Sequence, residues 1–181
     1  MVFMMEQLSF FEEKHNDPRP PLALNWNLWH GCTRASTGCL HCYVYRRDES
    51  IGKDPTVLHK TDNFNLPIRK LRSGQYKGMY KVPCGSHIYT CFSSDFFHPD
   101  ADGWRKDAWE MMHERSDCTF FMITKRPERT DGRPLIEEVS VGGESGANAR
   151  VCDYKWVEKV WLQCKENGIS FYYHQTGAKL L

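Results

Sequence analysis

The chain has 181 residues, with 24 Lys or Arg against 23 Asp or Glu, and its formal net charge is +1. A hydrophobic fraction of 40% and an aromatic fraction of 13% exclude an intrinsically disordered, collagen-like or coiled-coil protein. The near-neutral balance of charge gives no whole-molecule argument for binding to nucleic acid or to a membrane surface.

Residues 1–23 are expected to form a peripheral N-terminal segment, ahead of a single domain over residues 24–181. Met4, Leu8 and Phe11 can share one face of a short helix, and the proline-rich stretch after them would end any regular structure. The N-terminus does not have the pattern of a signal peptide. No apolar run approaches the roughly 18 residues of a membrane span. We therefore expect a cytoplasmic protein with no membrane partner.

Short segments rich in β-branched and aromatic residues alternate with helical patterns along the rest of the chain. Apolar residues at helical spacing predict helices around residues 104–112 and 157–164, and Gly168 is a C-cap candidate for the second helix. This alternation predicts an α/β fold, with a mostly parallel sheet of about five strands and flanking helices. The expected strands are residues 22–29, 88–92, 119–123, 138–141 and 169–173.

Charge is unevenly distributed between these elements. Residues 46–81 contain nine Lys or Arg and four Asp or Glu, whereas residues 95–117 contain three basic and seven acidic residues. One interpretation is that both are solvated faces. The other is that the basic stretch forms a surface that meets an anionic ligand or nucleic acid.

Each expected strand is followed by a cluster of polar residues. In a parallel sheet these clusters would converge at the carboxyl edge, where ligands and catalytic groups collect. The clusters are His30-Gly31-Cys32, Ser93-Ser94-Asp95, Thr124-Lys125-Arg126-Pro127, Gly142-Gly143-Glu144-Ser145-Gly146 and His174-Gln175-Thr176-Gly177.

The strongest local signal is the spacing Cys32-x6-Cys39-x2-Cys42. The eight cysteines of a cytoplasmic chain are not expected to form a disulfide framework, so these three thiols suggest a metal centre. One interpretation is a [4Fe–4S] cluster held by three thiolates, with its fourth iron free. The rival is a zinc site of the Cys₃His type, with His30 or His41 as the fourth ligand. Coincidence in a cysteine-rich chain is the third interpretation.

Of the other five cysteines, we expect Cys91, Cys118 and Cys164 to be buried as small apolar residues. Cys84 and Cys152 lie in loop-like sequence and receive no assignment.

With these residues identified, the chain resembles a phage- and prophage-associated three-Cys-motif family, a radical SAM-like group of unknown function. The resemblance covers most of residues 24–178 and implies a partial (βα) barrel with the cluster beyond the first strand. It depends on Asn25-Trp26-Asn27-Leu28-Trp29-His30-Gly31-Cys32, Gly38-Cys39-Leu40-His41-Cys42-Tyr43, Ser94-Asp95-Phe96-Phe97-His98, Thr124-Lys125-Arg126-Pro127, Gly142-Gly143-Glu144-Ser145-Gly146 and Gln175-Thr176-Gly177.

Two features depart from the pattern that the resemblance implies. The usual radical SAM spacing is Cys-x3-Cys-x2-Cys, but here the first gap is six residues. Similar members of the family carry a longer segment, with further strands, where this chain has only residues 128–141. The expected barrel is therefore open on one side, or completed by a second copy or another partner.

The resemblance implies that Cys32, Cys39 and Cys42 ligate three irons of a [4Fe–4S] cluster and that S-adenosylmethionine chelates the fourth. Reductive cleavage of this cofactor would lead to hydrogen abstraction from an unknown substrate, with electrons from a donor partner. The residues expected to bind the cofactor are Ser94, Asp95, Lys125, Arg126, Glu144 and Gln175.

Roles for these residues follow from the same resemblance. Ser94 and Asp95 would meet the methionine amino group or the ribose, and Glu144 could take a similar role. Lys125 or Arg126 would meet a carboxylate or an anionic substrate. The alternative is a non-catalytic module that holds Zn²⁺ or an iron–sulfur cluster and binds a nucleic-acid or protein partner.

Overall fold

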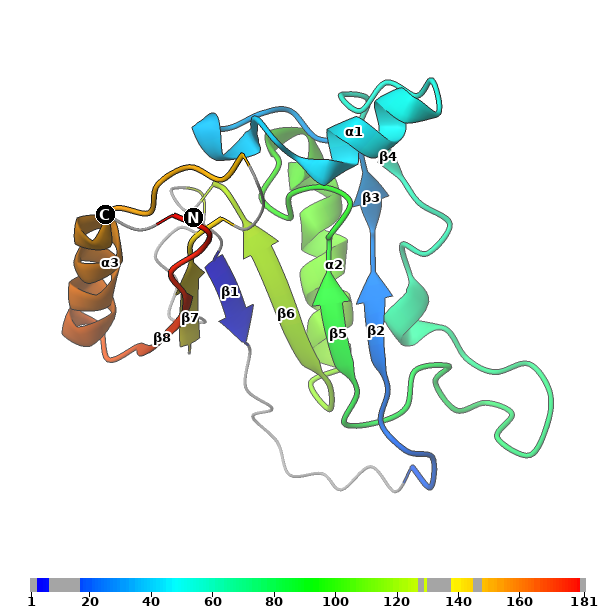
Figure 1. The fold of residues 1–181 in the computed structure, drawn as a ribbon. Coiled ribbons are helices and arrows are strands. Elements are labelled where there is room, and N and C mark those ends of the chain that lie inside the picture. Colours follow the sequence, from blue (N-terminus) through cyan, green and yellow to red (C-terminus); the bar gives the residue numbers. More distant parts are fainter. Residues whose placement is uncertain (1–2, 7–16, 127–128, 130–137, 145–147, 180–181) are drawn as a thin grey trace.

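The computed structural model describes residues 3–6, 17–126, 129, 138–144 and 148–179, which form a mixed α/β fold (Figure 1). Six strands make one sheet in the order β2-β5-β6-β1-β7-β8. The strands are β1 (Phe3–Glu6), β2 (Ala23–Trp26), β5 (His87–Thr90), β6 (Thr119–Thr124), β7 (Glu138–Gly142) and β8 (Ser170–Gln175).

The helices and a small second sheet complete these elements. β3 (Trp29–His30) pairs in antiparallel fashion with β4 (His59–Lys60). The helices are α1 (Tyr43–Ser50), α2 (Asp102–Glu114) and α3 (Tyr154–Glu166), and short 3-10 helices cover Thr37–Cys39, Leu66–Ile68 and Pro99–Ala101.

The strands predicted from sequence all run in the same direction. β2 pairs parallel with β5, β5 with β6, and β7 with β8. Only β1 runs the other way, between β6 and β7. The mostly parallel sheet is thus confirmed, and the carboxyl ends of β2, β5, β6, β7 and β8 meet at one edge, over which α1 lies (Figure 1).

The N-terminal segment is not peripheral as expected. Phe3–Glu6 is a strand in the middle of the sheet, where Phe3 faces Thr124 and Met4 faces both Ile123 and Ser140. Met4 therefore lies in a strand and not in the expected short helix, while Leu8 and Phe11 fall outside the described residues. Sequence periodicity could not reveal this pairing because the partners of β1 are more than a hundred residues away.

The sheet also differs from the expected one in its number of strands and its closure. It has six strands and not about five because β1 joins it. It is open: β2 and β8 lie at opposite ends of the strand order and do not pair with each other.

The first predicted strand is shorter than expected. It ends at Trp26, and the chain resumes as the separate two-residue strand β3. The sequence pattern also missed α1, an eight-residue helix at the start of the basic stretch. α2 and α3 match their predicted patterns, and Gly168 lies just beyond α3 with a φ of +67°, as a C-cap glycine does.

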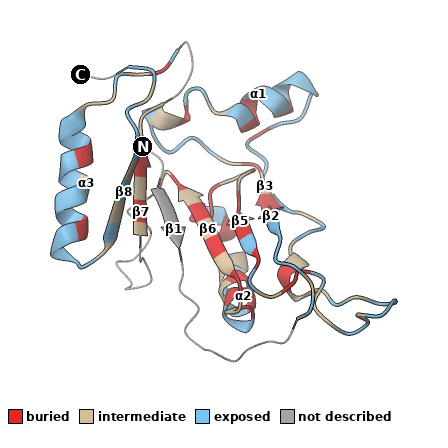
Figure 2. Ribbon diagram, turned by 60° about the horizontal axis from the view of Figure 1, so that its bottom comes forward, coloured by how far each residue is buried: buried red, intermediate tan, exposed pale blue. Residues whose placement is uncertain are grey.

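The core is divided between the two halves of the sheet (Figure 2). The larger cluster packs α2, through Ala108 and Met112, against strand residues such as Trp26, Ile88 and Phe120. The smaller cluster packs α3 against β7 and β8, and contains Val139, Val141, Val157 and Cys164. Alternate residues of β6 and β7 are buried, which fits the two-residue period of a strand.

A buried arginine fixes the long connection between β4 and β5. Arg115, directly after α2, has no exposed surface and donates to the backbone oxygens of Pro67 at 2.6 Å and Val82 at 3.0 Å. Its guanidinium also pairs with Asp117 at 2.7 Å. The cation thus satisfies carbonyl groups of a segment that has little regular structure.

Replacing Arg115 by Met should lower the free energy of unfolding by about 3–5 kcal/mol, because it removes the buried cation that pairs with Asp117 and donates to the loop carbonyls. Urea denaturation measures the change. Lys106→Met, on the exposed face of α2, is the matched control, and its free energy of unfolding should stay within about 0.5 kcal/mol of the parent value. Equal stability of the two variants would contradict this role of Arg115.

Candidate metal and cofactor site

The loop that carries the first cysteine is fixed by close backbone contacts. Gly31 has a φ of +90°, and a Cβ there would lie 2.2 Å from the backbone oxygen of Val57, so only glycine fits. Cys32 donates its N–H to Pro55 at 2.8 Å, and its carbonyl accepts from the Tyr45 hydroxyl at 2.6 Å. The backbone at Cys32 is therefore held from both sides.

The other two cysteines flank a turn that leads into α1. Cys39 ends a 3-10 helix whose first turn is capped by Ser36, with Oγ accepting from Gly38 N at 3.2 Å. Cys42 is the N-cap residue of α1 and donates its N–H to Cys39 O at 3.3 Å. One local turn therefore determines the spacing of these two thiols.

All three thiols line one cavity of about 650 Å³ at the carboxyl edge of the sheet. A cavity of this size can hold a cofactor. Five of the six residues predicted to bind the cofactor line the same cavity, and Gln175 does not. The lining residues are Cys32, Gly38, Cys39, His41, Cys42, Tyr43, Val44, Arg46, Cys91, Phe92, Ser94, Asp95, Ile123, Lys125, Arg126, Glu144, Asn148 and Ala149.

Cations from the strand ends hold the cysteine loop. Arg126 donates to Thr33 O at 2.8 Å and to Thr33 Oγ1 at 3.0 Å, and Lys125 Nζ donates to Gly38 O. Arg126 Nη1 also lies 3.9 Å from Cys32 Sγ. Positive charge therefore lies beside the thiols, where it favours bound anionic groups.

The buried carboxylate of Asp95 organises this arrangement. It accepts from Phe97 N at 2.9 Å, Thr124 Oγ1 at 2.8 Å and Lys125 N at 2.8 Å, and it lies 3.6 Å from Arg126. With these partners Asp95 positions the end of β6. This differs from the expected contact with a methionine amino group, which would have to compete with several internal hydrogen bonds.

The neighbouring Ser94 is also engaged internally, since its hydroxyl donates to Gly31 O. It therefore ties the loop after β5 to the start of the cysteine loop. Ser94 also lies in the wall of the cysteine cavity.

The thiols differ in acidity. Burial raises the pKa of Cys32 to about 11. Burial also acts to raise the pKa of Cys39, but the N–H groups of Ala35 and Ser36 and the charge of Lys125 outweigh it, so the net shift is downward. Metal ligation requires thiolates, and Cys39 is therefore the more readily ionised of these two thiols.

A fourth thiol, Cys91, lies in the cavity wall. It follows β5 directly, is fully buried, and is the single described residue other than glycine with a positive φ, at +63°. Burial raises its pKa well above the usual range. The expectation that Cys91 is buried is confirmed, but it lies beyond the end of the strand and not within it.

The glycine motifs after β7 and β8 pack backbone against backbone. A Cβ on Gly143 would lie 2.1 Å from Thr176 O, and one on Gly177 would lie 2.6 Å from Glu144 O. Gln175 Nε2 donates to Gly143 O at 3.2 Å. Gln175 therefore supports the glycine motif after β7, although it does not line the cysteine cavity. The two glycine motifs thus form one unit that positions Glu144.

Glu144 forms a close ion pair with Arg150, whose backbone N–H also donates to it at 3.1 Å. Hydrogen bonds from the Arg150 side chain lower the pKa of Glu144 to about 2. Arg150 in turn donates to Thr37 Oγ1 at 2.7 Å, so this pair also reaches the cysteine loop. The Glu144 carboxylate is therefore ionised at neutral pH and is held in place.

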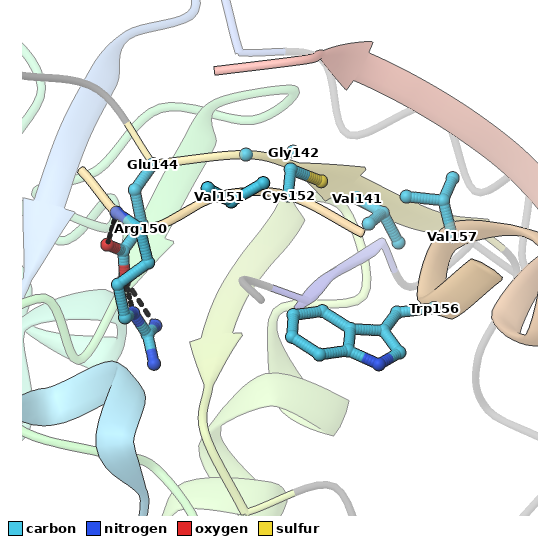
Figure 3. A pocket seen from close by; sticks show the side chains of 9 residues that line it. Val141, Gly142, Glu144, Arg150, Val151, Cys152, Trp156 and Val157 are labelled. Atoms are coloured by element: carbon cyan, nitrogen blue, oxygen red, sulfur yellow. Dashed lines mark hydrogen bonds and ion pairs between the residues drawn. The ribbon is translucent and has the colours of Figure 1, made fainter. Parts of the chain in front are cut away.

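Glu144 also borders a second, smaller cavity of about 70 Å³ beside α3. Figure 3 shows Glu144 and Arg150 at one end, with Trp156 and Val157 at the other. The lining in between is mainly apolar and includes Cys152. This cavity is too small for a cofactor.

The two histidines proposed as zinc ligands are separated by the fold. His41 lines the cysteine cavity, whereas His30 Nε2 lies 2.6 Å from Asp48 Oδ2 and borders another cavity. No three His, Cys, Asp or Glu side chains within the described ranges are arranged to hold a single metal ion. A tetrahedral zinc ion would need its ligands about 2.0–2.3 Å from one point.

A family model matches residues 22–138 and 134–180, which together make up most of the chain. Its description is "Protein of unknown function (DUF5131)". The chain belongs to the DUF5131 family. No curated protein and no solved structure matches it. The two DUF5131 matches include every residue that was predicted to bind the metal or the cofactor, from Cys32 to Gln175.

Three lining residues of this DUF5131 member, Tyr43, Arg46 and Asn148, were not predicted from sequence as site residues. Arg150, the partner of Glu144, was not predicted either. They lie outside the polar clusters at the strand ends, and the sequence assigned no role to any of them, although Tyr43 belongs to one of the motifs on which the resemblance depends. In the part of the chain that the structure describes, none of the helices combines the length and apolar character needed to cross a membrane.

The Glu144–Arg150 pair predicts a dependence of stability on pH. The folded pKa of Glu144, about 2, lies below its ordinary value, so its contribution is present above about pH 4.5 and is lost as the pH falls toward 2. Denaturant midpoints between pH 2 and 6 measure this effect. The Glu144→Gln variant should show a smaller loss over that window than the parent, and identical profiles would contradict the assignment.

Replacing Asp95 by Asn should destabilise the fold by about 1–3 kcal/mol, because the amide cannot accept from all the present donors and does not pair with Arg126. Urea denaturation and amide exchange at Lys125 test this. Asp107→Asn, which removes an exposed carboxylate 3.7 Å from Lys60, should cost less than about 1 kcal/mol. An unchanged exchange rate at Lys125 would count against the role of Asp95.

Proposed function

We propose that this chain is an iron–sulfur protein of the radical SAM-like type, with a [4Fe–4S] cluster held by Cys32, Cys39 and Cys42. The observation that carries the proposal is their common cavity. These thiols and the charged side chains of Lys125, Arg126 and Glu144 line one cavity at the edge where the carboxyl ends of five parallel strands meet. The proposal includes a partial (βα) barrel, open on one side, as the fold to which this sheet belongs.

The number of thiols and the size of the cavity support a cluster over a single zinc ion. A cluster takes its thiolates at separate irons, so its ligands are spread around a cavity instead of meeting at one point. The three cysteines line a cavity of about 650 Å³, and no described group of side chains converges to hold a single ion. The cavity thus suits the cluster in donor type and in size.

The charged side chains have defined tasks in this proposal. Lys125 and Arg126 would offset the negative charge of the thiolates and attract the carboxylate of S-adenosylmethionine, while the ionised Glu144 would attract its amino group or ribose hydroxyls. Asp95 would act indirectly by positioning Lys125 and Arg126. When bound, the reduced cluster supplies the electron that breaks the sulfonium bond of the cofactor.

The family match supports the proposal of a shortened barrel. The family model matches this chain in two segments, which overlap at residues 134–138. A chain that lacks an internal part of the family pattern would give such a divided match. In this chain β1 occupies the place between β6 and β7. We propose that the substrate, an electron donor or a second copy of this chain approaches the open sheet. We also propose that the protein acts in the cytoplasm, whose reducing conditions suit a reduced cluster.

The same shortening favours a second candidate function. A cluster-bearing or zinc-bearing module that binds a nucleic-acid or protein partner needs the cysteine loop but not a complete barrel. The short connection between β6 and β7 is consistent with that simpler role. Reductive cleavage of S-adenosylmethionine by the loaded protein would separate the two candidates.

The first test is the iron, zinc and acid-labile sulfide content of protein purified without oxygen. The cluster proposal predicts about four iron and four sulfide per chain, and a change of absorbance when S-adenosylmethionine is added. One zinc and no sulfide would replace the cluster with a structural zinc site.

Variants of the cysteine loop test the ligand assignment. Replacing Cys32, Cys39 and Cys42 together by Ala should abolish iron and sulfide binding, because no other described thiols flank the same turn. Cys164→Ala, which removes a buried thiol from α3, should leave the metal content unchanged. Full metal content in both variants would show that the assignment is wrong.

A further inference from the structure

A polar cavity of about 350 Å³, different from the two described above, lies beside α1 and is lined in part by the basic stretch. α1 borders both cavities through different residues: Val44 and Arg46 line the cysteine cavity, whereas Arg47 and Asp48, with the C-cap residue Ile51, line the polar one. The proposed cluster chemistry does not use this polar cavity. Its lining residues are Asn27, His30, Arg47, Asp48, Ile51, Lys53, His59, Thr61, Asn63 and Ser93.

A buried carboxylate organises one wall of the polar cavity. Asp48 is 1% exposed, and its Oδ2 lies 2.6 Å from His30 Nε2. The Arg47 guanidinium donates to Asp48 Oδ1 at 3.3 Å and lies 3.4 Å from His30 Nδ1. Asp48 is therefore hydrogen-bonded inside the wall, and the lining as a whole carries two cations, Arg47 and Lys53, against this one carboxylate.

The remaining charge of the polar cavity is positive, and hydrogen-bond donors are available there. Across the described residues, no hydrogen bond or ion pair engages Lys53 Nζ, Arg47 Nη1 or the side-chain amide nitrogen of Asn27. The Asn27 amide is oriented by its oxygen, which accepts from Ser93 N at 3.0 Å. An ammonium, a guanidinium and an amide thus border one concave space, and its single aliphatic lining residue is Ile51.

We propose that this polar cavity binds the phosphate group of a nucleotide or of a nucleic-acid strand. Phosphate is the anion that matches a guanidinium fork beside an ammonium, because its oxygens accept from both at once. A volume of about 350 Å³ exceeds that of a phosphate ion and leaves room for an attached sugar. Asn27, Thr61 and Asn63 would then face the hydroxyl groups of that sugar.

Two sources of phosphate would present the same chemistry. A free nucleotide would use the cavity alone, whereas a nucleic-acid strand would continue along other cations of residues 46–81, such as Lys60 beside Phe64. A strand releases counterions along its whole contact, so its affinity falls steeply with salt. The inference does not depend on the cluster, and it holds or fails separately from the proposed function.

The test uses the full chain and three probes: inorganic phosphate, AMP and a short single-stranded oligonucleotide. NMR titration should give saturable shifts at His30, Lys53 and Asn27 amides with each probe. The double variant Arg47→Gln/Lys53→Gln should weaken phosphate binding by about tenfold or more, since it removes both cations from the cavity. Lys53→Gln alone, which leaves the Asp48 contacts intact, should weaken it by a smaller but measurable factor.

The matched control is Arg72→Gln/Lys77→Gln, which removes the same charge from exposed positions of the same basic stretch outside the cavity. It should bind inorganic phosphate and AMP as the parent does. Equal weakening by the two double variants, or shifts that do not saturate at the cavity, would overturn the proposal in favour of diffuse attraction. Stronger, salt-sensitive binding of the oligonucleotide would identify a strand as the ligand, and preference for AMP would identify a nucleotide.

Discussion

The candidate site depends on the buried Asp95 carboxylate. It accepts hydrogen bonds from its own loop after β5 and from the end of β6, and it lies 3.6 Å from the guanidinium of Arg126. Arg126 in turn holds the backbone of Thr33 beside Cys32. One carboxylate therefore connects two strand ends with the cysteine loop, and it does so where burial makes the loss of a partner costly.

Much of the fold and of the site could be predicted from short-range patterns. The alternating burial of β6 and β7 appears in the sequence as β-branched and aromatic runs, and the polar clusters after the strands converge because the strands are parallel. What the sequence could not show is which groups the fold brings into contact. The pairing of β1, the capture of His30 by Asp48, and the ion pair of Glu144 with Arg150 each require the folded chain. Asp95 shows the same limit, since its place at a strand end predicted a cofactor contact but could not show its hydrogen bonds to Phe97, Thr124 and Lys125.

The environments of the thiols show how position decides reactivity within one short loop. Burial makes Cys32 hard to ionise, with a pKa of about 11, whereas backbone N–H groups and Lys125 favour the thiolate of Cys39. Of these two thiols, Cys39 would therefore be the more readily available to a metal ion as a thiolate. The guanidinium of Arg126 lies 3.9 Å from Cys32 Sγ and would support ionisation of the Cys32 thiol once a metal ion is present.

The central place of β1 has a consequence for how the chain folds. The half formed by β2, β5 and β6 and the half formed by β7 and β8 each pair within themselves, and β1 is the strand that joins them. Residues 3–6 thus find their partners only after β6 and β7, which follow them by more than a hundred residues, have been made. Closing so long a loop is entropically costly and slows folding. Until then, β6 and β7 present unpaired edges to which a strand from another chain could add, so this sheet is most exposed to mispairing during its own synthesis.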